Sequence, residues 1–319
     1  MTDAPGHLPV LARSVLDLLQ PRPGQRVVDC TAGRGGHAEL LAQAVGPSGH
    51  VTLMDRDADN LAHSAARVGA IGVPVHAVHA SFATCERVVL GSRPTGGTDG
   101  RTPGADLVLA DLGFASNQMD DPARGFSFQQ EGPLDMRLDR SAGEPAADLL
   151  ARITEEELSD AIFRLGEDPF ARRIARVIAD RRASTPLRTT TQLASAVVAA
   201  YGAKARFSRM HPATRTFMAL RILVNDELGA LRSLLDSVAR GCRGDGWLAR
   251  GARVAIISFH SLEDRVVKHA FADLERQGVA RRLTRKPVEA DEAEVRGNPR
   301  SRSAKLRVLE VGAEIAPGG

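Results

Sequence analysis

The feature that most constrains this chain is a short apolar segment, Arg26–Cys30, which runs directly into a glycine-rich turn and then a helical pattern from His37. Three more apolar segments follow, separated by helical stretches: Val51–Asp55, Val73–His79 and Asp106–Ala110. Apolar strands that alternate with helices form a parallel sheet that helices cover on both faces. We therefore predict a Rossmann-like α/β core, which binds ligands at the carboxyl ends of its strands.

The strand pattern stops near residue 121 and returns at Arg253–Ser258. The intervening residues show helical signals and no strand-like run. We predict a discontinuous core domain over residues 1–120 and 213–319. An inserted helical domain is expected over residues 121–212.

Several helix boundaries are predicted from capping signals. Thr154 begins a capping box, and Gly166 ends the helix that follows it. A single long helix is expected to begin at His211-Pro212 and to reach about Ala239. Ser261 is expected to cap the helix after the returning strand, because an acid stands three residues later at Asp264.

Basic residues gather in one part of the chain. Residues 170–222 hold eleven basic side chains and one acid, Asp180, although the net charge of the whole chain is only +3. Arginine suits bidentate contact with phosphate, and segregation of one sign favours a polyanionic partner. A solvated basic surface is the alternative. Three of these residues, Arg172, Arg173 and Arg176, are expected to share one side of a helix.

Composition excludes several classes of protein. With 319 residues, 43% of them hydrophobic and 25% charged, the chain resembles a folded globular protein rather than a disordered one. It contains no apolar run near the ~20 residues that cross a bilayer, and its first ten residues lack a secretory signal. The three cysteines form no Cys-x-x-Cys pair. We therefore expect a cytoplasmic protein with no metal site and no membrane partner.

Acids flank the glycine-rich turn. Asp29 ends the first apolar segment and Asp55 ends the second. Gly33, Gly35 and Ala38 match the loose fingerprint G-x-G-x-x-A, so a dinucleotide is one alternative. An ionised Asp29 disfavours a pyrophosphate at the helix N-terminus but favours a sulfonium or ammonium group. This pattern favours S-adenosylmethionine, with Asp55 accepting the ribose hydroxyls, over a dinucleotide and over a purely structural turn.

Asp111 follows the fourth apolar segment, and Gln118 comes shortly after it. A carboxylate and a carboxamide can hold a nitrogen acceptor by its N–H groups, and orienting such a weak nucleophile is most of its activation. Methylation at a pyrimidine carbon requires a cysteine nucleophile, and none lies near this segment. Transfer to an exocyclic amine is therefore favoured, with an ordinary turn at Asp111 as the alternative. Phe82, just beyond the third segment, is expected to line the site.

Several longer motifs resemble those of one family. They are Gly33-Arg-Gly-Gly-His37, Asp111-Leu-Gly-Phe-Ala-Ser-Asn-Gln118, Arg124-Gly-Phe-Ser-Phe128, Gly132-Pro-Leu-Asp-Met-Arg137, His211-Pro-Ala-Thr-Arg-Thr-Phe217, Ser258-Phe-His-Ser-Leu-Glu-Asp-Arg265 and Asn298-Pro-Arg-Ser-Arg-Ser303. Together they resemble the signatures of the bacterial ribosomal RNA small-subunit methyltransferase H family. The resemblance implies a class I S-adenosylmethionine-dependent methyltransferase core with an inserted helical domain. It also implies N4-methylation of a cytidine in the decoding centre of 16S ribosomal RNA. The implied partner is this RNA or the small ribosomal subunit, not DNA, and a homodimer is compatible with it.

The resemblance also implies site residues. It places the cofactor on Gly35, Gly36, His37, Asp55, Phe82, Asp111 and Gln118. Asp111 and His260 are the expected catalytic residues; His260 either orients or deprotonates the amine, or is a turn histidine without that role. The chain departs from the family pattern Asp-Leu-Gly-Val-Ser-Ser at Phe114 and Ala115. A contact made by the first serine hydroxyl of that pattern would therefore be missing.

Other interpretations stay open from the sequence. Phe126 and Phe128 either stack on an extruded base or anchor their loop in the core. The arginines within Arg281–Arg307 are expected to bind RNA backbone together with the insertion. Two other classes of function remain, an NAD-linked oxidoreductase, against which Asp29 argues, and a non-catalytic RNA-binding assembly factor.

Overall fold

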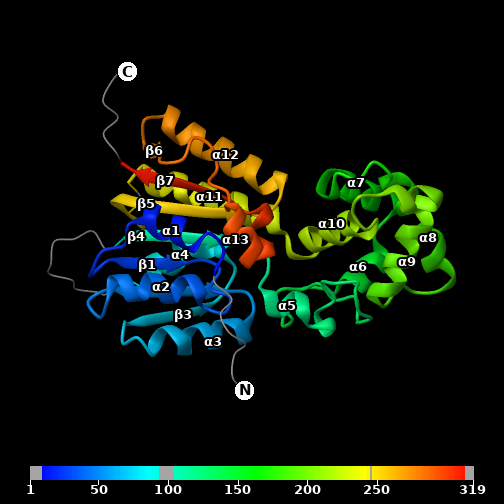
Figure 1. Ribbon diagram of the computed structural model, residues 1–319, viewed down its shortest axis with the longest axis horizontal. Coiled ribbons are helices and arrows are strands. Elements are labelled where there is room, and N and C mark those ends of the chain that lie inside the picture. Colours follow the sequence, from blue (N-terminus) through cyan, green and yellow to red (C-terminus); the bar gives the residue numbers. More distant parts are fainter. Residues whose placement is uncertain (1–8, 93–103, 245, 313–319) are drawn as a thin grey trace. The chain divides into compact units, whose positions relative to one another are not determined.

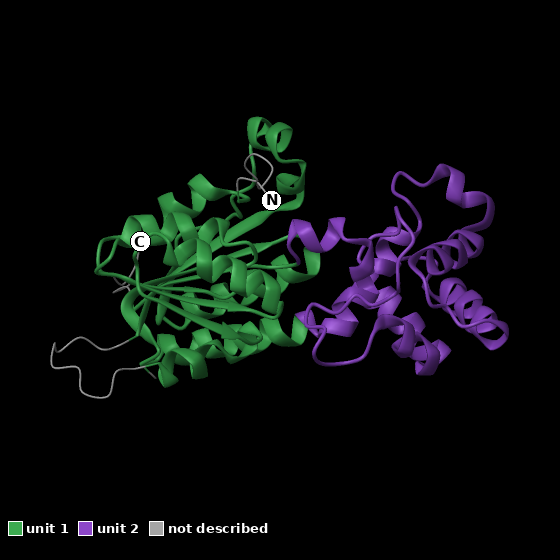
Figure 2. Ribbon diagram, turned by 90° about the horizontal axis from the view of Figure 1, so that it is seen from below, with its two compact units in different colours: residues 1–113, 228–319 green, residues 114–227 purple. Residues whose placement is uncertain are grey.

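The computed structural model describes residues 9–92, 104–244 and 246–312, and the chain forms two compact units. The first comprises Met1–Gly113 and Leu228–Gly319, and the second comprises Phe114–Glu227 (Figure 2). The second unit thus extends beyond the expected insertion, residues 121–212, at both ends. At its C-terminal end the extension contains a helix, α10 (Ala213–Asn225), and most of its buried apolar side chains belong to the core of the second unit.

The first unit is built on a seven-stranded sheet with the order β3-β2-β1-β4-β5-β7-β6 (Figure 1). From β1 to β7 the strands are Arg26–Asp29, His50–Asp55, Val75–His79, Ala105–Asp111, Leu248–Ser258, Ala280–Arg282 and Lys305–Val311. Strands β1 to β5 run parallel, whereas β7 runs antiparallel to β5 and β6. The predicted Rossmann-like α/β core is confirmed.

The order of the strands reverses between β1 and β4. From β1 the chain builds outward through β2 and β3, and it then returns to the other side of β1 to add β4 and β5. The register pairs Asp29 with Leu53 of β2 and with Leu109 of β4, so the carboxyl ends of these three strands are neighbours. Such a reversal is where open α/β sheets bind their ligands.

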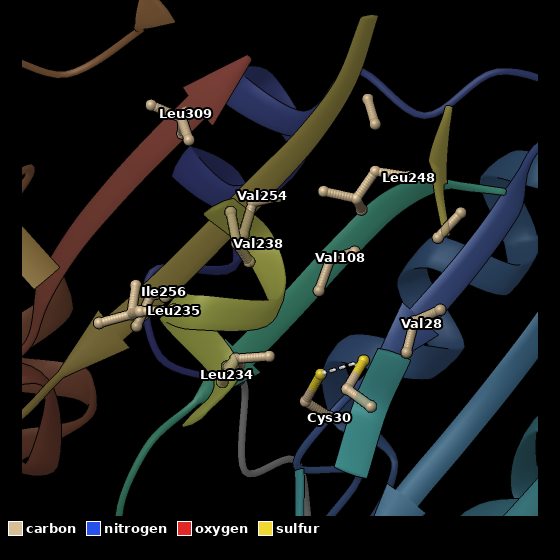
Figure 3. Packing of buried hydrophobic residues seen from close by; sticks show 14 of the residues in the cluster. Val28, Cys30, Val108, Leu234, Leu235, Val238, Leu248, Val254, Ile256 and Leu309 are labelled. Carbon is tan, nitrogen blue, oxygen red and sulfur yellow. Dashed lines mark hydrogen bonds between the residues drawn. The ribbon is translucent and has the colours of Figure 1, made fainter. Parts of the chain in front are cut away.

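Helices cover both faces of the sheet. Neighbouring residues of a strand point to opposite faces. Val27 belongs to the core that α1, α2 and α3 share. Val28 belongs to the core that α4, α11 and α12 share, part of which Figure 3 shows. The sulfur atoms of Cys30 and Cys85 lie 3.6 Å apart on the second face. The helices are Ala12–Leu19 (α1), Gly36–Val45 (α2), Ala58–Gly69 (α3), Cys85–Gly91 (α4), Glu227–Cys242 (α11), Ser261–Arg276 (α12) and Glu292–Gly297 (α13).

The second unit has a helical core of its own. Buried side chains from its helices form one cluster, which contains no residue of the first unit. The predicted capping box begins α7, because Thr154 Oγ1 accepts the Glu157 N–H at 3.2 Å and the Glu157 carboxylate accepts the Thr154 N–H at 3.0 Å. Besides α10, the helices are Ser116–Asp120 (α5), Ala146–Arg152 (α6), Glu155–Gly166 (α7), Ala171–Ser184 (α8) and Thr190–Tyr201 (α9).

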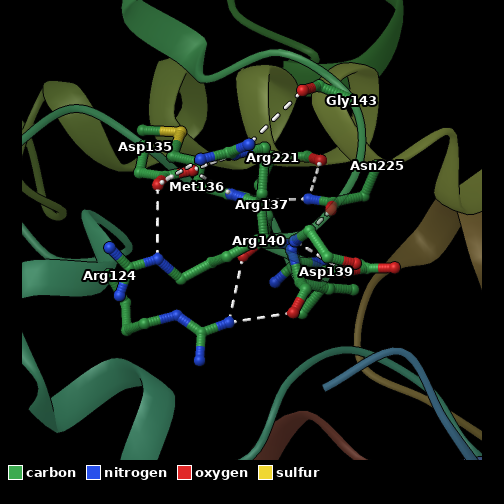
Figure 4. A network of polar contacts seen from close by, with 11 residues as sticks. Arg124, Asp135, Met136, Arg137, Asp139, Arg140, Gly143, Arg221 and Asn225 are labelled. Atoms are coloured by element: carbon green, nitrogen blue, oxygen red, sulfur yellow. Dashed lines mark hydrogen bonds and ion pairs between the residues drawn. The ribbon is translucent and has the colours of Figure 1, made fainter. Parts of the chain in front are cut away.

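A polar network holds the irregular segment between α5 and α6 against α10 (Figure 4). Asn225 of α10 donates its side-chain amide to the Met136 carbonyl at 2.7 Å and accepts the Leu138 N–H at 2.8 Å. The buried Arg124 donates to the carbonyls of Arg137 and Leu138. Two of the family-like motifs, those that contain Arg124 and Arg137, therefore build this segment.

Two predicted helix boundaries are wrong. The long helix expected from Pro212 to Ala239 is two helices, because Asp226 adopts a left-handed conformation with φ of 47° and ends α10. The helix α12 is capped by His260 rather than Ser261, since the imidazole Nδ1 of His260 accepts the Glu263 N–H. Across the described residues, no helix is both long and apolar enough to cross a membrane.

Candidate active site at the carboxyl ends of the strands

Three carboxylates end neighbouring strands of the first unit. Asp29 ends β1, Asp55 ends β2 and Asp111 ends β4. The parallel pairing of these strands puts all three acids at one edge of the sheet. The turn and helix start that contain Gly35, Gly36 and His37 follow β1 at the same edge.

The glycine-rich turn requires glycine at Gly35. This residue caps α2 with φ of 81°, and a Cβ atom there would lie 3.1 Å from the backbone of Ser64 on α3. Gly33, with φ of 49°, donates its N–H to Asp55 Oδ2 at 2.7 Å. Asp57 donates its N–H to the other oxygen, Oδ1, at 2.8 Å. Backbone donors thus fix the Asp55 carboxylate beside the turn.

We expect Gly35→Ala to destabilise the protein by about 1–2 kcal/mol, because alanine is strained at positive φ and its methyl group meets α3. Gly278→Ala is the matched control, since Gly278, in the turn that ends α12, also has a positive φ of 73° but an added Cβ would meet no atom within 4 Å. Urea unfolding of both variants measures the difference. A loss in Gly35→Ala no larger than that in Gly278→Ala would contradict the close approach of the turn to α3.

Asp29 is buried, with 1% of its surface exposed. Burial raises its pKa to about 7, the Thr31 N–H that its carboxylate accepts at 3.0 Å opposes this rise, and the nearby Asp55 adds to it. Near neutral pH the group is therefore divided between its acid and its carboxylate. A bound cation would stabilise the carboxylate.

Asp111 is tied to the first strand through its backbone, because its N–H donates to Thr31 Oγ1 at 2.6 Å. Burial raises the pKa of its carboxyl to about 8, and the charges of Asp29 and Glu263 add to this. Its Oδ1 atom is buried and has no hydrogen-bond partner among the described residues. A buried carboxylate oxygen without a donor is costly, so this atom is available to a ligand.

His37 faces Asp111. Its Nε2 lies 3.7 Å from Asp111 Oδ2 and, like Oδ1 of that carboxyl, is buried without a hydrogen-bond partner among the described residues. Burial lowers the pKa of His37 to about 4, against the effect of a hydrogen bond to the Val10 backbone. The imidazole is therefore neutral near pH 7, and the pair leaves two unpaired polar atoms at the end of β4.

His260 follows β5, the neighbour of β4, at the same edge of the sheet. Its Nε2 lies 3.2 Å from Glu263 Oε1, and the Glu263 carboxylate also accepts the Phe259 N–H at 2.9 Å. Both side chains are largely buried. The Nδ1 atom of His260 accepts the Glu263 N–H that caps α12. The Nε2 atom has no hydrogen bond of acceptable geometry among the described residues.

The other two predicted cofactor residues lie on different units. Phe82 begins a short 3-10 helix after β3, η1 (Phe82–Thr84), and packs half-buried against the core of the first unit. Gln118 lies on α5 of the second unit, where its side-chain oxygen accepts the Ala115 N–H at 2.8 Å. The structure thus brings the predicted residues together at one edge of the sheet in the first unit, with Gln118 as the exception.

Thr31 and Glu263 were not predicted as site residues. Thr31 connects the ends of β1 and β4, because its hydroxyl oxygen accepts the Asp111 N–H. No spacing in the sequence indicates this contact. Glu263 lies three residues after His260, within a motif whose acids were attributed to helix capping. Assigning the cap to His260 instead of Ser261 would have identified it, because Glu263 is then the third residue of α12 and contacts the capping residue.

Phe114, Phe126 and Phe128 anchor loops of the second unit. Phe126 is buried and stacks on Phe114, with ring centroids 5.1 Å apart, and Arg221 lies over the Phe114 ring at 4.8 Å. Phe128 stacks on His211 at 4.5 Å. Of the two interpretations of Phe126 and Phe128, anchoring is the one that the structure supports. The departure from the family pattern at Phe114 belongs to the same stack.

The basic residues divide into structural and exposed ones. Arg182 donates to the Leu150 and Ile153 carbonyls at the end of α6. Arg172 and Arg173 of α8 are exposed. The arginines within Arg281–Arg307 were expected to bind RNA backbone. Arg307 does not fit this expectation, because its side chain is buried and its Nε lies 2.7 Å from Asp264 Oδ1.

The chain is similar to known proteins over nearly its whole length. Residues 4–312 match the model of the MraW methylase family. A protein of Nitratidesulfovibrio vulgaris named ribosomal RNA small subunit methyltransferase H is 45% identical, over 97% of this chain and 86% of that protein. Proteins of the same name from Trichormus variabilis and Sorangium cellulosum are 43% and 46% identical, covering 97% and 94% of this chain and 93% and 89% of theirs.

Proposed function

Because the chain belongs to the MraW methylase family, we propose that it transfers the methyl group of S-adenosylmethionine to the exocyclic N4 of a cytidine in 16S ribosomal RNA. The names of the relatives support ribosomal RNA of the small subunit as the substrate. The observation that carries the proposal is the edge of the sheet where Asp29, Asp55 and Asp111 end adjacent strands. A donor with a positive sulfur and no phosphate suits such a site.

The residues present fit this donor. Backbone donors already hold the Asp55 carboxylate in place for a diol. The unpaired Nε2 of His37 and Oδ1 of Asp111 offer buried polar contacts. When bound, S-adenosylmethionine supplies an electrophilic methyl group on a sulfonium. We assign its binding to Gly35, Gly36, His37, Asp55, Phe82 and Asp111.

Asp111 is proposed to act on the acceptor. Its ionised carboxylate accepts a hydrogen bond from the amino group and so fixes the orientation of a weak nucleophile. The amine loses one proton when it is methylated, and Asp111 Oδ1 is the atom proposed to take it. A carboxyl whose pKa burial raises to about 8 is a stronger base than an exposed one. His260, with Glu263 beside it, is proposed to position the amine rather than to deprotonate it.

The second unit is proposed to recognise RNA. The exposed arginines Arg172 and Arg173 are not paired with carboxylates among the described residues, so they are available to phosphates. Arg176, the third member of the predicted group, lies 3.6 Å from Glu155 in an exposed ion pair that contributes little stability.

The proposal is tested by a single-turnover reaction of the purified protein with labelled S-adenosylmethionine and small ribosomal subunits that lack the modification. We expect stoichiometric label in the RNA. Binding of the subunits without incorporation of label would instead support a non-catalytic assembly factor.

A further inference from the structure

Four large hydrophobic side chains are exposed among the described residues, and all four lie in the second unit. They are Phe163, Val198, Phe207 and Met210. Phe207 is the most exposed, at 86%. Single exposed hydrophobic residues are common on protein surfaces, so exposure alone assigns no role to this ring. Its surroundings decide the question.

Phe207 lies in a segment that carries only positive charge. It ends the 3-10 helix η3 (Gly202–Phe207). Lys204, Arg206 and Arg209 are all exposed, and residues 202–212 contain no acid. We refer to residues 202–210 as the η3 segment. An exposed aromatic ring between cations is the combination that binds single-stranded nucleic acid, since the ring stacks on bases and the cations contact phosphates.

Phe163 provides a contrast within the same unit. This ring is also exposed, at 62%, but it lies on α7 beside Arg164, which pairs with Asp160 at 3.2 Å. Three glutamates begin the same helix, at residues 155–157. The environment of Phe163 is thus mixed in charge, as on an ordinary solvated surface.

The start of the η3 segment is fixed to the core of the unit. Tyr201, immediately before it, donates its hydroxyl to the buried Asp168 at 2.8 Å. The Tyr201 ring packs on Phe170 with centroids 4.6 Å apart, and Lys204 Nζ lies 5.0 Å from the centroid of the Phe170 ring. After Phe207, the Ser208 hydroxyl donates to the Met210 carbonyl at 2.6 Å. A ligand that binds Phe207 therefore has little backbone to order.

We propose that the η3 segment binds single-stranded RNA, with the Phe207 ring stacked on a base and with Arg206 and Arg209 in contact with phosphates. The inference rests on the proposed function, which supplies an RNA substrate. It adds a contact surface that holds an unpaired base of that RNA. RNA is favoured over a protein partner because the η3 segment carries three exposed cations and no acid beside its two exposed apolar side chains, Phe207 and Met210.

The test measures binding of the full-length protein to a fluorescent 12-nucleotide single-stranded RNA. Phe207→Ala is expected to weaken binding about tenfold, the usual effect of removing one stacked base. Phe207→Leu, which stays apolar but has no aromatic face, is expected to weaken it similarly, whereas Phe207→Trp retains affinity. Arg206→Gln with Arg209→Gln is expected to lower the slope of log affinity against log salt by about 0.7 for each phosphate that is no longer neutralised.

Phe163→Ala is the matched control and is expected to leave RNA affinity unchanged. Thermal unfolding confirms that each variant is folded, because an exposed side chain contributes little to the core. Wild-type affinity in Phe207→Ala, or in Phe207→Leu, would overturn base stacking. Equal losses of affinity in Phe163→Ala and Phe207→Ala would also overturn it.

The outcome is separable from that of the proposed function. Methyl transfer by the wild-type protein together with unchanged RNA affinity of Phe207→Ala would refute the η3 segment and leave the function in place. Weaker RNA binding by Phe207→Ala without any methyl transfer by the wild-type protein would support the η3 segment and refute the proposed methyl transfer.

Discussion

Replacing Asp111 with asparagine is expected to lower the single-turnover rate of methyl transfer by about a hundredfold or more, within the range known for removal of a general base. Asparagine keeps the size of the side chain but neither accepts a proton nor carries charge. Asp106→Asn is the matched control: Asp106 lies near the other end of the same strand, where its carboxylate accepts the Arg26 N–H at 2.8 Å. An unchanged rate in Asp111→Asn would exclude Asp111 as the proton acceptor.

The same substitution is expected to raise the melting temperature of the ligand-free protein at pH 9. Burial raises the pKa of Asp111 from its usual value of 3.8 to about 8. Between these values the folded protein binds a proton that the unfolded chain does not, so the free energy of unfolding falls as the pH rises. The stability that comes from this bound proton is lost above about pH 8. Asparagine has no such dependence. Lower activity with greater stability would show that the acid is kept for function.

The affinity for S-adenosylmethionine is expected to increase steeply from pH 6 to pH 9. A cation binds best when Asp111 and Asp29 are ionised, and their pKa values are raised to about 8 and about 7. At pH 6 only about one molecule in a hundred has Asp111 ionised, and only about one in ten has Asp29 ionised. The change at Asp111 alone predicts roughly a hundredfold weaker binding than at pH 9, and the change at Asp29 adds up to about tenfold. Titration calorimetry across this range measures the effect.

Two comparisons isolate the cause of this pH dependence. S-adenosylhomocysteine carries the same amino acid group but a neutral sulfur, so its affinity is expected to change less with pH. Asp111→Asn is expected to remove most of the dependence and to leave the part that belongs to Asp29. Binding of both ligands with the same pH profile would show that the acids do not respond to the sulfonium.

The sequence predicted the sheet well because both faces of its parallel strands are buried. Val27 and Val28, or Leu107 and Val108, enter opposite cores, so each strand is a continuous apolar run between polar turns. The acids at the strand ends were visible for the same reason, since Asp29 and Asp55 are the first charges after such runs. Their shared location follows from parallel pairing alone.

Three other features were not predictable in this way. The break at Asp226 interrupts a continuous amphipathic pattern, and this residue, with its left-handed backbone, is the second-last residue of the second unit. The pairing of Arg307 with Asp264 joins residues far apart in the sequence, so the basic stretch looked free. His260 displaced Ser261 as the cap of α12 because an imidazole nitrogen accepts a backbone N–H as a hydroxyl does.

The proposed methyl transfer is tested most directly by nucleoside mass spectrometry of 16S ribosomal RNA from a strain without this protein, before and after treatment of its small subunits with the purified protein and S-adenosylmethionine. We predict that a cytidine methylated at N4 is absent before treatment and appears after it. An RNA that already carries this nucleoside in the deletion strain, or that gains its methyl group on another base, would contradict the proposed function.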